Sequence, residues 1–568
     1  MNETRKNLDE KILLVLLPFW TPLIPPLGIS CLKGYLEKNG YKVTTNDANV
    51  KNEFTDIYHK YFNVLRNAIP EDKRGNFYNI GHNVLQNHMM VYINCDKDFE
   101  ILKTTKTLIK EYYFTIVDEE VLNTLNGFIN EFFKKMEVYI GQLIDENKPS
   151  IVGLSVFTGT LAPSLFTFRL IKNKWPNIRT IMGGGIFSDH LRIDSPNFKA
   201  FMKQSDCIDN IIVGEGEVLF LKLLKGEFPK DQKVISLKDI NNNVYDIKHA
   251  ELPDFSDLNL DDYIQLSAYT SRSCPFQCNF CSETVQWGRY RKKDAKFVVS
   301  ELMQLHNKYK TQIFLMGDSL LNPIVSDLAS EMSKQDISIY WDGYLRADKE
   351  VCSIENTLNW RRGGYYRARL GIESGSQRVL NLMGKRITTE QIKKAISSLA
   401  YAGIKTTTYW VVGYPGETEE DFQMTLDLIK ELKNDLYTAE CNPYNYFISG
   451  QVGSDKLALK GISPLFNEEM ANNMLNQVWV VNGNPSRREI YSRVSRFVKH
   501  CNELGIPTPY SLKEVYNADE RWKKLQINAV PSIVEFKNSK ELIREDRQIK
   551  DLNCAKYDFS EDGDFNFI

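Results

Sequence analysis

Residues 270–281 read Thr-Ser-Arg-Ser-Cys-Pro-Phe-Gln-Cys-Asn-Phe-Cys, which sets Cys274, Cys278 and Cys281 in a C-x3-C-x2-C spacing. Three thiolates this close together form a soft-ligand group that suits iron–sulfur or zinc better than magnesium or calcium. A closed structural zinc site needs four protein ligands, and the next cysteine, Cys352, lies far along the chain. The triplet therefore favours a [4Fe–4S] cluster with one open iron, with zinc as the alternative.

This triplet, with the aromatic Phe280 just before its third cysteine, resembles the radical S-adenosylmethionine (SAM) superfamily. The resemblance implies that the three cysteines are the catalytic and metal-binding residues. It also implies that SAM chelates the open iron, and that an electron from the cluster cleaves SAM to a 5'-deoxyadenosyl radical. An electron donor such as flavodoxin or ferredoxin is the expected protein partner.

Strand-like and helical segments alternate on both sides of the triplet, which predicts an α/β protein. We expect strands at 264–270, 312–316, 338–344, 366–371, 405–412 and about 438–447. These six βα units resemble the partial (β/α)6 barrel of radical SAM enzymes, placed here at 259–452. Ligand sites in such barrels lie at the carboxyl ends of the strands.

The strand ends of this barrel carry motifs that resemble the SAM-binding segments of the family. Asp318 follows the second strand, where the family engages the methionyl ammonium; capping of the next helix is the alternative. Lys385 is the expected partner of the SAM carboxylate. The full set of residues that the resemblance assigns to SAM is Phe280, Asp318, Arg346, Glu373, Ser374, Lys385, Trp410 and Gly413.

The first 235 residues predict a Rossmann-like, doubly wound domain, because buried strands at 11–17, 41–45, 150–156, 180–182 and 210–213 alternate with helices. A helical insertion at about 51–148 interrupts them and includes a long amphipathic helix. Its His59, His82, His88 and Cys95 match no metal-ligand spacing, so we expect them to pack within helices.

Four segments of this domain, Pro25–Gly28, Ser155, Gly183–Gly185 and Gly214–Glu217, resemble the cobalamin-binding domain that precedes the barrel in one radical SAM subfamily. The resemblance assigns cobalamin to Trp20, Ser155, Thr158, Gly183, Gly184, Gly185, Gly214 and Glu215. The chain lacks the D-x-H-x-x-G motif of many cobalamin domains, so we expect no histidine ligand to cobalt. Trp20 either covers the lower face of the cofactor or packs under the sheet. A cobalamin fold that binds nothing is the alternative.

The remaining segments are a linker at 236–258, with a hairpin expected within 229–253, and a mostly helical domain at 453–568 that ends in an acidic stretch at 560–564. A formal net charge of −2 gives no footprint for nucleic acid or an anionic membrane. The ten cysteines form no disulfide framework, and the first ten residues are charged without a secretory apolar core. We expect a cytoplasmic monomer.

Together the two resemblances imply a cobalamin-dependent radical SAM methyltransferase that methylates an unactivated carbon of a natural-product or peptide substrate. A second hypothesis is that the same architecture performs a non-methylating rearrangement or an oxidative cyclisation. From a different class, the chain is a non-catalytic cobalamin or redox sensor.

Overall fold

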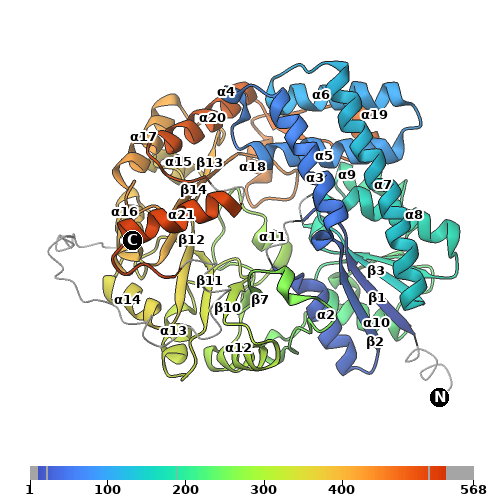
Figure 1. The fold of residues 1–568 in the computed structure, drawn as a ribbon, viewed down its shortest axis with the longest axis horizontal. Coiled ribbons are helices and arrows are strands. Elements are labelled where there is room, and N and C mark those ends of the chain that lie inside the picture. Colours follow the sequence, from blue (N-terminus) through green and yellow to red (C-terminus); the bar gives the residue numbers. More distant parts are fainter. Residues whose placement is uncertain (1–9, 21–23, 189, 509–511, 532–568) are drawn as a thin grey trace.

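A computed structural model describes residues 10–20, 24–188, 190–508 and 512–531 (Figure 1). Two six-stranded parallel sheets organise this part of the chain, one in each half of the sequence. The expected α/β class, with a Rossmann-like sheet followed by a partial barrel, is therefore confirmed. The charged residues 1–9 and the acidic stretch 560–564 lie outside the described residues.

The first sheet has the strand order β2-β1-β3-β4-β5-β6. Its strands are β1 (Lys11–Leu16), β2 (Lys42–Asp47), β3 (Ile151–Ser155), β4 (Arg179–Gly183), β5 (Asn210–Val213) and β6 (Val234–Ser236). Ile12 and Leu14 of β1 join one apolar core, while Leu13 and Val15 join another on the opposite face. This two-sided burial explains why β1 is apolar throughout instead of alternating.

Four helices belong to the two faces of this sheet: α2 (Leu27–Lys38), α8 (Leu161–Lys174), α9 (Pro196–Met202) and α10 (Gly216–Leu224). The hairpin expected within 229–253 is wrong. Residues 234–236 instead form β6, which runs parallel to β5, and short 3₁₀ turns follow it at 237–240 and 247–249. The chain returns to the open edge of the sheet because Ile235 completes the apolar core beneath β5.

The insertion between β2 and β3 is helical, as expected. Its helices are α3 (Asn52–Ala68), α4 (Glu71–Arg74), α5 (Phe77–Asn94), α6 (Asp98–Tyr113) and α7 (Glu119–Asn147). Helices α3, α5, α6 and α7 occupy the upper right of Figure 1 and share an apolar core with the first sheet. His82 and His88 hydrogen-bond to the hydroxyls of Tyr58 and Tyr61, at 2.9 and 3.1 Å, so both pack within the helices.

The second sheet has the order β14-β13-β12-β11-β10-β7, in which every strand is parallel to its neighbours. Its strands are β7 (Leu266–Ala268), β10 (Ile313–Met316), β11 (Tyr340–Leu345), β12 (Tyr365–Glu373), β13 (Lys405–Val412) and β14 (Thr438–Pro443). The intervening helices are α12 (Ala295–Tyr309), α13 (Val325–Ser333), α14 (Ile354–Arg362), α15 (Gln377–Leu382), α16 (Thr389–Tyr401) and α17 (Glu419–Glu431). Six βα units in sequence order make the predicted partial barrel.

The cysteine triplet follows β7 and is framed by β8 (Ser271–Arg272), β9 (Arg291–Lys292) and the short helix α11 (Glu283–Trp287). Beyond the barrel lie α18 (Ser454–Ala458), β15 (Ile462–Pro464), α19 (Glu468–Met474), β16 (Trp479–Val481), α20 (Arg487–Glu503) and α21 (Leu512–Leu525). The helical periodicity of residues 465–480 predicts a helix there, but only Glu468–Met474 is helical, and residues 479–481 form β16, which pairs with β15. The β-branched and aromatic run Val478–Val481 favours a strand there. Within the described ranges, no helix is both long and apolar enough to cross a membrane.

Candidate functional site

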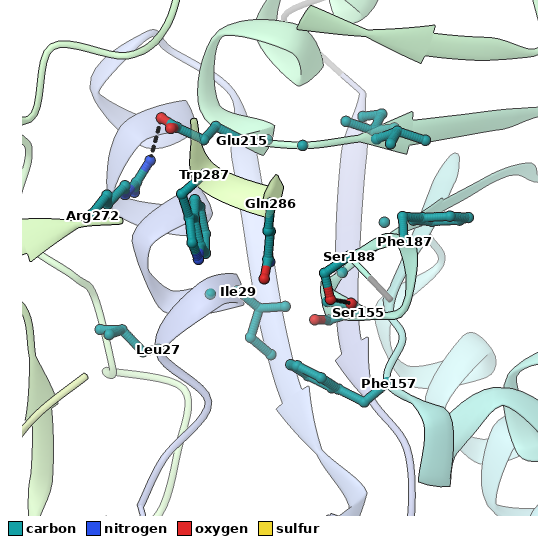
Figure 2. Close-up of a pocket in the computed structure, with 18 of the residues that line it drawn as sticks. Leu27, Ile29, Ser155, Phe157, Phe187, Ser188, Glu215, Arg272, Gln286 and Trp287 are labelled. Atoms are coloured by element: carbon teal, nitrogen blue, oxygen red, sulfur yellow. Dashed lines mark hydrogen bonds and ion pairs between the residues drawn. The ribbon is translucent and has the colours of Figure 1, made fainter. Parts of the chain in front are cut away.

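A cavity of about 1230 Å³ opens between the two sheets (Figure 2). Part of its wall is the carboxyl-terminal edge of the first sheet, where parallel α/β folds place their ligands. The opposite wall comes from residues that flank the cysteine triplet on both sides. Figure 2 shows Gln286 and Trp287 reaching from α11 toward Ser155 and Phe157 of the sheet edge.

All eight residues predicted to bind cobalamin line this cavity: Trp20, Ser155, Thr158, Gly183, Gly184, Gly185, Gly214 and Glu215. Gly184 has φ 115°, and a Cβ there would lie 2.4 Å from the Val156 nitrogen. A Cβ on Gly28 would meet no atom within 4 Å, since this residue faces the open cavity. The glycine-bordered edge therefore has both the close backbone packing and the space that a large planar ligand requires.

Trp20 is 45% exposed and does not pack under the sheet. Its ring stacks on Phe157, with centroids 4.3 Å apart and planes 24° apart, at the border of the cavity. This pair forms an aromatic surface suited to the apolar face of a ligand.

The insertion supplies a wall that the sequence analysis missed. Asn79, His82 and Gln86 line the cavity from α5. Burial lowers the pKa of His82 to about 4, so its ring is neutral at pH 7. The polar spacing of three and four residues, on a helix that is otherwise largely apolar, is the signal that would have identified this face.

The three cysteines lie together in the loop between β8 and α11. The Cys281 amide donates to the Cys278 carbonyl at 3.0 Å, and Arg346 Nη1 lies 3.7 Å from Cys278 Sγ. The Arg346 guanidinium also stacks over Phe276, 4.1 Å from the ring centroid. The structure thus brings Arg346, predicted to contact SAM, directly to the cysteine loop.

Burial raises the pKa of Cys274, and raises that of Cys281 to about 12. A negative charge on Cys278 would raise both pKa values further, which places the three thiols within electrostatic reach of one another. Such thiols are deprotonated by a bound metal rather than by their surroundings. Among the described residues, no three His, Cys, Asp or Glu side chains are grouped as ligands of a single metal ion. A four-iron cluster does not require such a group, because it binds each cysteine to a different iron.

Asp318 does not reach the cavity. Its buried carboxylate accepts hydrogen bonds from the Thr270 amide at 2.9 Å, the Thr270 hydroxyl at 2.7 Å and the Ser271 hydroxyl at 2.6 Å. It therefore fixes the segment before the cysteines rather than capping a helix. The adjacent Ser319 lines the cavity instead and donates to Glu283, which also lines it.

Glu373 and Lys385, both predicted to contact SAM, form a buried ion pair with Oε1 and Nζ 2.7 Å apart. A Cβ on Gly371 would lie 2.6 Å from the same Glu373 oxygen, so this pair depends on a glycine in β12. The Ser374 hydroxyl is buried against Thr425 at 3.4 Å.

The other residues predicted to contact SAM lie in three different surroundings. Phe280 packs in a small apolar cluster with Met383 and Tyr414. Trp410 is fully buried, and its indole nitrogen donates to the Thr408 hydroxyl at 2.9 Å, so it belongs to the barrel core and borders neither cavity. Gly413 lines a second, smaller cavity.

Beside the large cavity, a buried ion network joins the segment after β5 of the first sheet to strands β8 and β9, which frame the cysteine loop. Arg272 Nη1 lies 2.7 Å from Glu215 Oε2, and Arg272 also pairs with Glu217 (Figure 2 shows the contact with Glu215). Arg291 is a second partner of Glu215. Burial raises the pKa of Glu217, but the Arg272 guanidinium outweighs it and holds that pKa below its usual range. Arg272 and Arg291 were missed by the sequence analysis, since long-range pairs leave no local pattern.

Comparisons with known proteins agree with this geometry. Residues 269–429 match the model of the radical SAM superfamily. The chain is 28% identical over 317 residues to an uncharacterized methyltransferase of Pyrococcus horikoshii, covering 52% of this chain and 67% of that protein. It is 27% identical over 331 residues to the anaerobic magnesium-protoporphyrin IX monomethyl ester cyclase of Rubrivivax gelatinosus, covering 53% of this chain and 57% of the cyclase. The chain thus spans between about half and two thirds of the length of these relatives.

Among solved structures, the radical SAM methyltransferase TsrM from Kitasatospora setae, with cobalamin and a [4Fe–4S] cluster bound, shares 13% identity. The match covers 95% of this chain and 98% of that one at a TM-score of 0.58, which establishes a shared fold. The resemblance read from the sequence is confirmed for this part of the chain: residues 269–429 match the radical SAM superfamily, and the chain shares its fold with TsrM, which was solved with cobalamin and a [4Fe–4S] cluster bound.

Proposed function

We propose that this protein is a cobalamin-dependent radical SAM methyltransferase acting on an unactivated carbon of a natural-product or peptide substrate. The observation that carries the proposal is that residues next to the cysteine triplet and the glycine-bordered sheet edge face the same cavity. Arg272 lies two residues before Cys274, and Glu283 lies two residues after Cys281. A group bound near the triplet and a ligand bound at the sheet edge would therefore share one cavity and be held close together.

The cofactors follow from the same arrangement. Residues 1–235 would hold cobalamin at the sheet edge, and the barrel at 259–452 would hold the cluster and SAM. When bound, a [4Fe–4S] cluster supplies the electron that cleaves SAM reductively. The three cysteine sulfurs bind it, and Arg346 holds positive charge 3.7 Å from Cys278 Sγ.

The described residues orient the reactants and exclude water rather than perform acid–base steps. Asp318 holds the cysteine-bearing segment, and the Glu373–Lys385 pair lies at the carboxyl end of β12. Lys385 can pair with the carboxylate of SAM if it exchanges its partner Glu373. Trp20 and Phe157 offer an aromatic surface at the sheet edge.

The experiment combines anaerobic reconstitution with methyl-labelled SAM. With iron, sulfide, cobalamin and a reductant, the protein should form 5'-deoxyadenosine and place labelled methyl on its bound cobalamin. Cys278→Ala should abolish the 5'-deoxyadenosine. Cys352→Ala is the matched control, since Cys352 lies outside the loop and, within the described part of the chain, bonds only to the Asp348 and Gln391 carbonyls. A protein that binds cobalamin but never cleaves SAM would instead support the sensor hypothesis.

Oxidative cyclisation or another non-methylating reaction is the second candidate. The similarity to a protein named as a cyclase favours keeping it. One measurement distinguishes the two reactions. A methyltransferase transfers the label from SAM to its product, whereas an oxidative cyclase gives an unlabelled product that has fewer hydrogen atoms than the substrate.

A further inference from the structure

A second cavity, of about 260 Å³, adjoins the first. Gln86 and Thr158 line both cavities, so the two are neighbours. The smaller one is enclosed by α5, the ends of β13 and β14, the β15–β16 hairpin and the start of α20. This combination of insertion, barrel and C-terminal hairpin forms a compartment beside the proposed reaction site.

The lining of this cavity is polar yet nearly uncharged. No carboxylate side chain occurs among its described lining residues, and amide side chains recur: Asn83, Gln86, Asn445, Asn476, Asn482 and Asn484. Burial lowers the pKa of His190 to about 4, so that ring is neutral. The charge of Arg487 is paired with Glu111 at 3.4 Å. A charged group would be desolvated here without compensation, so the cavity suits a neutral ligand.

The edge of β16 faces this cavity. The Leu465 amide donates to Val478 O at 2.8 Å, and the Asn482 amide donates to Gly461 O at 2.9 Å, so residues 478, 480 and 482 bond toward β15. In an antiparallel pair the backbone groups alternate. Those of Gln477, Trp479 and Val481 therefore point the other way.

Two of these three positions already have partners. The Asn197 side chain donates to Gln477 O at 3.2 Å and accepts from Gln477 N at 2.8 Å, as a neighbouring strand would. Trp479 forms a bridge with Tyr446. Val481 lines the cavity, and none of the described residues hydrogen-bonds to its outward N–H and C=O.

A further donor points to a ligand. The indole Nε1 of Trp479 is buried and has no hydrogen-bond partner among the described residues. Trp479 lines the same cavity, next to Val481 in β16. An unsatisfied buried donor costs about 1–3 kcal/mol, so an acceptor in the cavity would be favoured. The site thus offers a paired donor and acceptor at Val481 and a separate donor at Trp479.

We propose that the smaller cavity binds an uncharged peptide segment of the substrate in extended form, with one residue pairing against Val481 as an added strand. An extended peptide presents an N–H and a C=O side by side, which matches the Val481 pair, and its next carbonyl can accept from Trp479 Nε1. A sugar offers hydroxyls without that fixed backbone pair. This inference rests on the proposed function, which identifies the peptide as the substrate. Because the smaller cavity adjoins the large one, the next residue of a peptide bound in the smaller cavity would lie in the large cavity.

The test uses the full-length reconstituted protein labelled with 5-fluorotryptophan. Its eight tryptophans give separate ¹⁹F signals, and Trp479→Phe assigns the relevant one. The probe is N-acetylvaline N'-methylamide, with free valine and glucose as the charged and polyol comparisons. We expect the Trp479 signal to shift saturably with the capped valine and not with the other two.

Two variants locate the contact. Val481→Pro removes the outward N–H without removing a bond to β15, and should weaken binding of the probe about fivefold, as one net hydrogen bond predicts. Val481→Ala keeps the N–H and should bind within about twofold of the parent. A Trp479 signal that the capped valine leaves unmoved, or that glucose moves equally, overturns the proposal. So does wild-type affinity in Val481→Pro. The proposed function is read separately, from 5'-deoxyadenosine formation, which needs no probe.

Discussion

Removing the Arg272 side chain should loosen the contact between the segment after β5 of the first sheet and the β8 strand beside the cysteine loop. Its side chain is 11% exposed and pairs with Glu215 and Glu217, whose side chains are 2% and 6% exposed. In Arg272→Met, Glu215 keeps Arg291, but Glu217 loses its ion-pair partner. Breaking a buried pair on one side costs about 3–5 kcal/mol, because the remaining charge stays buried. At about 1.4 kcal/mol per tenfold, local opening should become at least about a hundredfold more frequent.

Hydrogen exchange measured by mass spectrometry checks this locally, which avoids assuming that a multidomain chain unfolds in two states. Peptides covering 210–217 and 269–273 should exchange faster in Arg272→Met. Lys174→Met is the control, because the Lys174 and Glu137 side chains are 49% and 46% exposed and their pair is worth at most about 1 kcal/mol.

The double variant Arg272→Met with Glu217→Gln decides the cause. The double variant removes both charges. Its loss in the free energy of local opening should therefore be smaller than the sum of the losses in the two single variants, by a coupling energy of about 1–3 kcal/mol. Single effects that add within about 0.5 kcal/mol would refute the idea that these two side chains stabilise the contact as a pair.

Three further predictions test other parts of the site. Arg346→Gln removes the charge beside Cys278 and should shift the reduction potential of the reconstituted cluster to more negative values, measured by a redox titration. Asp318→Asn replaces an acceptor of three protein donors with an amide and should lower the free energy of local opening by about 1–3 kcal/mol, measured as faster hydrogen exchange in peptides covering 269–273; unchanged exchange would contradict the anchoring role. His88 has its pKa lowered to about 4 by burial, so the unfolded chain binds more protons between about pH 6.5 and 4, and stability falls as the pH drops through that window. His88→Gln should remove up to about 3 kcal/mol of this loss, as measured from the pH profile of stability.

Local patterns predicted the barrel well. The strand expected at 405–412 is β13, Lys405–Val412, and that expected at 312–316 is β10, Ile313–Met316. Each is a short apolar or β-branched run bounded by helices, so its pattern lies within one segment of sequence. The same holds for the glycine-bordered sheet edge, because each glycine follows its own strand directly.

Long-range pairing accounts for what the sequence analysis missed. The amphipathic run at 465–480 predicts a helix, but the C-terminal end of that run is a strand because Ile462–Pro464 lies beside it. Asp318 carries a carboxylate suited to the ammonium group of SAM, yet that carboxylate accepts hydrogen bonds from the Thr270 and Ser271 hydroxyls. Both residues lie far from Asp318 in the sequence. Trp410 lies in a strand-end motif, but its own position in the pleat turns it into the core.

The helical insertion between β2 and β3 contacts both the barrel and the segment that follows it. In the sequence it interrupts a sheet that is complete without it. In the structure, Asn76 Nδ2 donates to Cys441 O at 2.8 Å in the last barrel strand, and Asn94 Nδ2 donates to Asn473 O at 2.8 Å beside the hairpin. His82 and Gln86, between these two contacts, line the large cavity. The insertion thus closes one side of the space between the two sheets while holding both the barrel and the hairpin. If the proposed function holds, a carbon-centred radical would need such enclosure, because solutes with weak C–H or S–H bonds would otherwise quench it.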